Sequence, residues 1–253
     1  MVRKENTFRK HVSSLAFSFL TGTESTEMVD TFLEQRFSLF HAPLLNAAVH
    51  SSLVSRYPRR SYCLSSSSET VEKYGRSLRE GEIEYYDFFA VNVSSSSLLK
   101  KDEISFYLEE KKRGRIGHIG LECAGEEDDE ERIEEAYGFI EYVILPLSSA
   151  DAVEKNAGWK IYEKARSLSL PVFVSASRLN ELESSLSDEK RRQMKERHPS
   201  WNAEIWELKF LHSLDGVVTV IVPFENISLV RSGVKALRRY HSLTEEERVF
   251  LLQ

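Results

Sequence analysis

The feature that most constrains this chain is an alternation of short apolar segments with amphipathic segments, which occurs eight times. It is clearest where the basic segment 111–113 runs through Gly114 into the apolar segment 116–121. Lysine and arginine favour the negative end of a helix, and glycine readily adopts the left-handed conformation that ends helices. The junction therefore predicts a helix that turns into a buried parallel strand.

Eight such units predict the whole architecture. We expect strands at residues 12–19, 37–41, 61–64, 85–91, 116–121, 140–145, 171–174 and 217–222, each followed by a helix. Strict alternation over 253 residues predicts an α/β protein, a (β/α)8 TIM barrel in a single domain, 1–253. The barrel is expected at about 12–240. Thr244 and Glu247 form a capping box that predicts a tail helix within 241–253.

The net charge of −6 and pI near 5.8 argue against a nucleic-acid or membrane-surface partner, because both carry negative charge. No apolar run approaches the roughly 20 residues that span a bilayer, and the start of the chain has no apolar signal core. Two cysteines, Cys63 and Cys123, are too few for a disulfide framework. We expect a cytoplasmic protein whose partner is a small molecule or another protein.

Five segments resemble, in the correct order, the motifs of the aldo-keto reductases. They are residues 84–89, 114–121, 157–158, 217–223 and 243–247. The resemblance covers nearly the whole chain and is strongest to the anaerobe-type members that carry a ferredoxin-like tail, which this chain lacks. It implies a barrel that reduces carbonyl groups with NADPH.

By the same resemblance, the catalytic residues of the family are replaced in this chain. His41, Asn46, Ser65 and Asn92 stand where the family has its aspartate, tyrosine, lysine and histidine. An amide cannot donate a proton as a phenol can, and a serine supplies no positive charge to acidify that phenol. All four roles are vacant, so we expect no reductase activity.

The cofactor positions are changed as well. Glu122-Cys123 replaces the Ser-Asn pair that holds the nicotinamide amide, and Ile144 replaces a glutamine. Phe224 and Glu225 would place bulk and negative charge where a phosphate should approach. We therefore expect no cofactor. If NADP(H) does bind, the candidate residues on and after the eighth strand are Glu225, Asn226 and Arg231.

Polar residues at strand ends form a second candidate site. The expected ligand-binding residues at the barrel mouth are His41, Asn92, Glu122, Cys123 and Ser175. Two serine runs, 65–68 and 94–97, are expected in loops at the same mouth. They are either a rim of hydroxyls for a polar ligand or loop filler, and the second interpretation is favoured.

Three functions remain open. The preferred one is a degenerate aldo-keto reductase barrel, a pseudoenzyme that binds a small ligand or a protein. The first alternative is an NADPH-dependent oxidoreductase with substitute residues. The second is an enzyme with Cys123 as nucleophile, His41 as base and Asn92 as orienting amide. His41, His50 and Glu122 could hold a metal, but no ligand spacing supports this, so no metal is expected. The tryptophans at 159, 201 and 206 are expected to pack against the barrel.

Overall fold

The computed structural model describes residues 12–19, 25–42, 53, 55–92, 100–179, 182–238 and 242–253. Eight parallel strands close into a barrel in chain order, and the first strand pairs with the last. The strands are β1 (Leu15–Ser18), β2 (Leu39–His41), β3 (Cys63–Ser68), β4 (Tyr86–Asn92), β5 (Ile116–Glu122), β6 (Tyr142–Pro146), β7 (Val172–Ser175) and β8 (Val217–Pro223). The predicted (β/α)8 barrel is confirmed.

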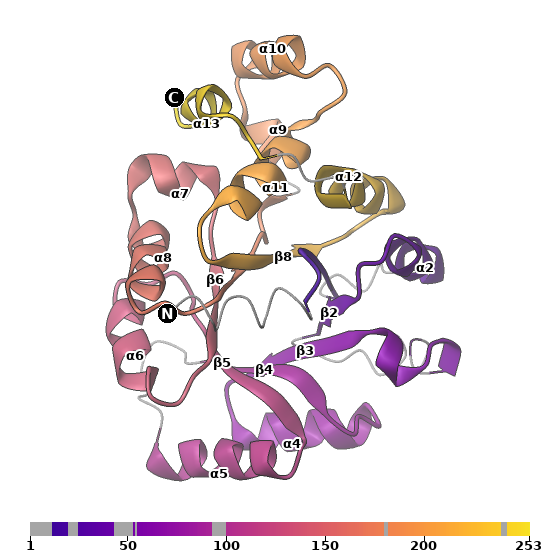
Figure 1. Ribbon diagram of the computed structural model, residues 1–253, viewed down its shortest axis with the longest axis vertical. Helices are drawn as coiled ribbons and strands as arrows, with labels where there is room; N and C mark the ends of the chain where they lie inside the picture. Colours follow the sequence, from indigo (N-terminus) through magenta and orange to yellow (C-terminus); the bar gives the residue numbers. More distant parts are fainter. Residues whose placement is uncertain are drawn as a thin grey trace.

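Helices surround this ring of strands (Figure 1). They are α2 (Thr26–Glu34), α4 (Val71–Glu80), α5 (Lys101–Lys112), α6 (Asp129–Ala136), α7 (Ser149–Glu154), α8 (Ala157–Ser167), α9 (Leu182–Ser185), α10 (Asp188–Arg197), α11 (Ala203–Ser213), α12 (Ile227–Arg238) and α13 (Glu245–Leu251), with a short 3-10 helix, η1, at Arg59–Ser61. Helices α10 and α13 lie together at one end of the molecule (Figure 1). Within the described ranges, no helix has the length and apolar character needed to cross a bilayer.

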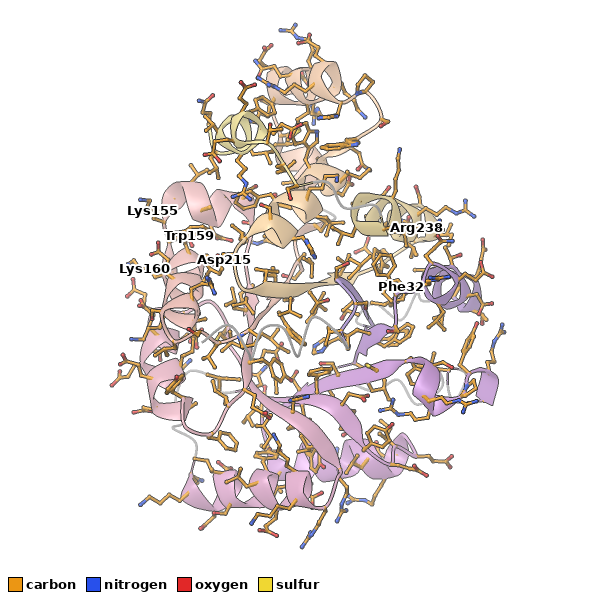
Figure 2. All side chains as sticks on the ribbon, viewed as in Figure 1. Phe32, Lys155, Trp159, Lys160, Asp215 and Arg238 are labelled. Carbon is orange, nitrogen blue, oxygen red and sulfur yellow. The ribbon has the colours of Figure 1, made fainter. Side chains whose placement is uncertain are left out.

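Two hydrophobic clusters fill the fold, one on each side of the strand layer. The larger lies between the strands and the helices and includes Phe17, Phe32 and Trp206. The smaller fills the barrel lumen and consists of Val12, Ala16, Leu39, Phe88, Ala90, Tyr142, Ile144, Phe173, Val218 and Ile221. The labelled Phe32 belongs to the inner face of α2, whereas Lys155 and Lys160 project from the surface (Figure 2). The lumen is thus a packed core with polar residues toward the carboxyl ends of the strands.

Local signals place several element ends as expected. Gly114 has φ +75° and follows the end of α5, and β5 begins two residues later. The Thr244 hydroxyl accepts a hydrogen bond from the amide of Glu247, whose carboxylate accepts one from the amide of Thr244. This reciprocal pair confirms the capping box that opens α13.

Other expectations need correction. Serines 65–68 do not follow the third strand but form most of it, because they pair with residues 88–91 of β4. The polar segment 180–200, for which no helix was expected, contains α9 and α10. Helix α7 was also missed. Of the helix expected at 46–56, Leu53, Ser55 and Arg56 are helical; Asn46 and His50, like serines 94–97, lie outside the described residues.

Candidate functional site

The alternation of side chains along the strands decides which residues face the lumen. Successive residues of a strand point to opposite faces of the sheet. Phe40 and Leu64 belong to the cluster beneath the helices, so their neighbours His41 and Ser65 face the lumen. By the same alternation, Glu122 faces the lumen at the end of β5.

Two buried side chains are joined by a hydrogen bond inside the lumen. The Nδ1 atom of His41 lies 3.0 Å from Oγ of Ser65. Tyr142 of β6 is buried in the same lumen. Beside His41 on β1, Ser18 is fully buried, and its hydroxyl has no partner within the described part of the chain. The pair of His41 and Ser65 therefore links β2 and β3 on the lumen face of the barrel.

A second polar pair lies at the ends of β4 and β5. Asn92 and Glu122 are register partners, and the Asn92 amide donates to the Glu122 carboxylate over 3.1 Å. Both side chains are half-buried. The structure thus brings together Asn92 and Glu122, two of the residues expected at the mouth, and leaves them accessible from solvent.

Burial sets the charge of His41. Desolvation lowers the pKa of its imidazole from 6.5, and the nearby Glu122 carboxylate acts in the opposite direction. Because the first effect is larger, His41 is neutral at pH 7. A neutral ring accepts a hydrogen bond at one nitrogen and donates at the other, so His41 can pair with a hydroxyl without any counter-ion.

Tyr142 is a phenol whose environment makes it a weak acid. Burial raises its pKa well above 10, and the carboxylates of Glu122 and Glu141 raise it further. None of the eight strands carries a lysine or arginine. Within the described ranges, the strands that line the lumen therefore offer the phenol no fixed positive charge of the kind that would acidify it.

Cys123 lies on the wrong side of the strand layer for the expected site. Its side chain belongs to the cluster between barrel and helices, whereas His41 and Asn92 face the lumen. Burial raises the pKa of its thiol well above 9, and the Asp129 and Glu122 carboxylates add to that rise. The thiol is therefore neutral and inert, and the placement of Cys123 at the mouth was wrong.

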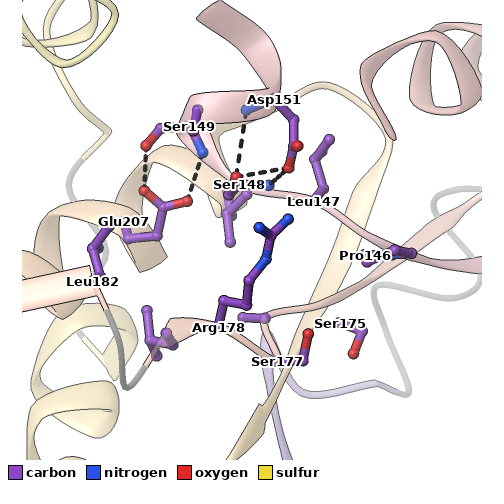
Figure 3. Close-up of a pocket in the computed structure, with 14 residues that line it drawn as sticks. Pro146, Leu147, Ser148, Ser149, Asp151, Ser175, Ser177, Arg178, Leu182 and Glu207 are labelled. Atoms are coloured by element: carbon purple, nitrogen blue, oxygen red, sulfur yellow. Dashed lines mark hydrogen bonds between the residues drawn. The ribbon is translucent and has the colours of Figure 1, made fainter. Parts of the chain in front are cut away.

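Ser175, the last residue of β7, lines a cavity of about 270 Å³ between β6, β7, α7 and α11 (Figure 3). None of the residues that line it belongs to the pair of His41 and Ser65 or to the pair of Asn92 and Glu122. The expected mouth residues are therefore divided between two places, and Ser175 is part of a second one.

Comparison with solved structures identifies the architecture. Neither the models of known protein families nor the curated proteins include a match. An aldo-keto reductase from Bacillus halodurans in its holo form matches with a TM-score of 0.76 at 20% identity, covering 95% of this chain and 91% of that one. The chain has the aldo-keto reductase fold. One from Klebsiella pneumoniae in complex with NADPH matches at 0.75 and 14% identity, covering 95% and 90%. The aldose reductase from Schistosoma japonicum matches at 0.70 and 12% identity, covering 94% and 87%.

These comparisons confirm the sequence resemblance at the level of the fold. None of the structures described above supports the narrower likeness to ferredoxin-tailed members. His41, Ser65 and Asn92, three of the positions aligned with catalytic residues, lie on the consecutive strands β2, β3 and β4. Asn46, the fourth position, lies outside the described residues.

The segment after β8 of this aldo-keto reductase fold differs from expectation. Phe224 has no exposed surface, and its ring centroid lies 5.1 Å from that of Phe17, with Gly233 against its edge. The ring therefore fills the core. The sequence had suggested that Phe224 obstructs an approaching phosphate, and the structure corrects this expectation. Asn226 caps α12 by accepting from the amide of Leu229.

The other two cofactor candidates are surface residues. Glu225 is exposed, and Arg231 is exposed and 3.5 Å from Glu27. Within the described ranges, no three His, Cys, Asp or Glu side chains are grouped to hold a metal ion. The segment after β8 thus presents a carboxylate and a capping amide, a poor match to the phosphates of NADP(H).

Sequence reasoning missed Tyr142, which was treated only as part of the sixth strand, and the hydrogen bond between Ser65 and His41. A usable signal was present. Tyr142 and Gly120 are register partners on adjacent strands, and a large residue beside a glycine on one face of a sheet indicates a ring packed over the missing side chain.

We expect Glu122→Gln to lower the pKa of His41 further, because the carboxylate is the group that raises it. An NMR titration of the His41 ring measures this, with Glu131→Gln on the exposed face of α6 as control. The folded-state pKa lies below 6.5, so the unfolded chain binds the proton first as pH falls. The contribution of His41 to the free energy of unfolding is therefore retained above pH 6.5 and declines as the pH falls below it. An unchanged His41 pKa in Glu122→Gln would show that the two groups do not interact.

Proposed function

We propose that this protein is a diverged member of the aldo-keto reductase family that binds a small ligand at the barrel mouth and reduces no carbonyl. The observation that carries this is the charge of the lumen. Its ionisable groups on strands include Glu122 and a neutral His41, and no lysine or arginine lies on any strand. A proton donor for a developing alkoxide needs the opposite environment.

The two available acids fit that task poorly. Burial raises the pKa of Tyr142 and lowers that of His41. The phenol is therefore too weak an acid, and the imidazole is not in the protonated form that could act as one. Tyr142 also has no exposed surface. Among the described residues, a carbonyl substrate at the mouth would therefore meet neither an acid of suitable strength nor a compensating positive charge.

The residues at the mouth favour a ligand rich in hydrogen-bond donors. The Glu122 carboxylate accepts one bond from Asn92 and retains further lone pairs, and both residues are partly accessible. The Asn92 carbonyl is a second acceptor. A neutral polyol or an amine fits this arrangement better than an anion, since Glu122 repels negative charge.

The cofactor of the fold relatives fits poorly. NADP(H) would supply a hydride, and the structures from Klebsiella pneumoniae contain NADPH or NADP. In this chain the exposed Glu225 and the capping Asn226 occupy the segment after β8. Neither supplies the positive charge that phosphate groups require.

A fluorescence titration with NADPH and NADH, followed by an NADPH-linked assay with several aldehydes, tests the proposal. We expect no saturable binding at micromolar concentration and no reduction above the buffer rate, with the Klebsiella pneumoniae enzyme as positive control. Micromolar affinity together with aldehyde reduction lost in Tyr142→Phe or His41→Ala would overturn the proposal and establish an oxidoreductase with substitute residues. The Cys123-based enzyme lacks support, since its thiol is buried away from the lumen.

A further inference from the structure

A cavity separate from the lumen lies between β6, β7, α7 and α11. Its volume is about 270 Å³, close to the lower limit of small-molecule sites in proteins. Four leucines supply its apolar wall: Leu147, Leu179, Leu182 and Leu211. None of the lumen residues described above lines it, so its occupancy is independent of the function proposed for the mouth.

Arg178 is the one positively charged side chain among the described residues that line this cavity. Its guanidinium points into the cavity toward Ser148 (Figure 3). Within the described part of the chain, Arg178 makes no hydrogen bond or ion pair. Arg178 is an exposed residue at the opening of the cavity. With no partner among the described residues, its guanidinium is suited to bind a carboxylate through two parallel hydrogen bonds.

Two buried carboxylates also line the cavity, but donors from the chain already bind them. Glu207 accepts from both the amide and the hydroxyl of Ser149, at 2.7 and 2.5 Å. Asp151 accepts from the amide and hydroxyl of Ser148 and from the Asn156 amide. These bonds hold α7 against α11 and complete the N-terminal cap of α7.

The shape and chemistry together define the ligand. We infer that the cavity binds a small organic acid with a branched apolar tail, whose carboxylate lies on Arg178 and whose tail lies among the leucines. The Ser177 hydroxyl, also at the cavity, can donate to the same carboxylate. A ligand of this size gains modest affinity, with a dissociation constant on the order of 1 mM.

Three matched probes test the inference: 4-methylpentanoate, 4-methylpentan-1-ol and 4-methylpentylamine. They share one tail and differ in head group. NMR titration of the whole protein is expected to show saturable binding of the acid, with shifts confined to the cavity residues, and much weaker binding of the alcohol and amine. Equal or tighter binding of the amine would mean that Glu207 and Asp151 dominate and would overturn the inference, as would the absence of acid binding.

Two substitutions place the acid in the cavity. Arg178→Gln is expected to weaken acid binding about tenfold or more, because a charge-assisted pair is lost. Lys160→Gln, an exposed change on α8 that points outward (Figure 2), is the charge-matched control and should have no effect. Ala150→Phe, at the exposed rim, should block the cavity and abolish binding without disturbing the fold. Undiminished binding in Arg178→Gln would refute the role of the guanidinium.

Discussion

Replacing Gly120 with alanine is expected to destabilise the protein by about 3 kcal/mol, as overpacking of a buried site does. An added Cβ would lie 2.4 Å from Cζ of Tyr142 and 2.6 Å from two further ring atoms. Both residues are on strands that pair in register, and the ring is fully buried between Phe88 and Phe173. Neither side can move without disturbing the lumen. Urea unfolding of the purified variant measures the loss.

Two further variants make this prediction specific. At Gly138, an added Cβ would meet no atom within 4 Å, so Gly138→Ala should leave stability nearly unchanged. Tyr142→Leu shortens the side chain that causes the clash. In the Tyr142→Leu background, the additional cost of Gly120→Ala should therefore be much smaller than in the wild type. Equal costs of Gly120→Ala in both backgrounds would mean that the clash with the ring is not the cause.

Trp206→Ala is expected to cost about 3–5 kcal/mol, the range for truncating a large buried aromatic side chain. The indole is fully buried, and its centroid lies 5.1 Å from Trp201, 5.2 Å from His198 and 5.8 Å from Phe250. It is the common contact of α11, the segment after α10 and α13. Its loss should therefore loosen the tail helix as well as lower the free energy of unfolding.

Trp159→Ala provides the control for this second prediction. Trp159 is half-buried on α8 and packs mainly on Tyr162, at 5.0 Å. We expect a cost of about 1–2 kcal/mol, because less area leaves water on folding. Hydrogen exchange should show faster opening of α13 in Trp206→Ala and unchanged exchange there in Trp159→Ala. The same cost and exchange pattern in both variants would contradict the packing described here.

The centre of the lumen shows how a serine fits at the position where the alignment places a lysine. Ser65 occupies that position and lies 3.0 Å from Nδ1 of His41. Its hydroxyl pairs with the neutral imidazole without adding a charge. This buried pair therefore needs no counter-ion.

The candidate site was only partly predictable. His41, Asn92 and Glu122 were placed correctly at strand ends because strand ends follow from the apolar pattern. Cys123 was misplaced because it follows Glu122 by one residue, and one residue reverses the face of a strand. Ser175 was placed at a strand end, but the cavity that it lines is built by helices distant in sequence.

The sequence alone determined the alternation of strands and helices, and from it the closed barrel, since the period of apolar residues and the residues at helix ends are local properties. Gly114 and the capping box at Thr244 belong to this class. Only the tertiary structure decided that the weak strand former Ser65 lies within β3, and that the rings of Tyr142 and Phe224 turn into the core. These outcomes depend on which strands pair and which face each residue presents, and both are settled by contacts between segments far apart in the chain.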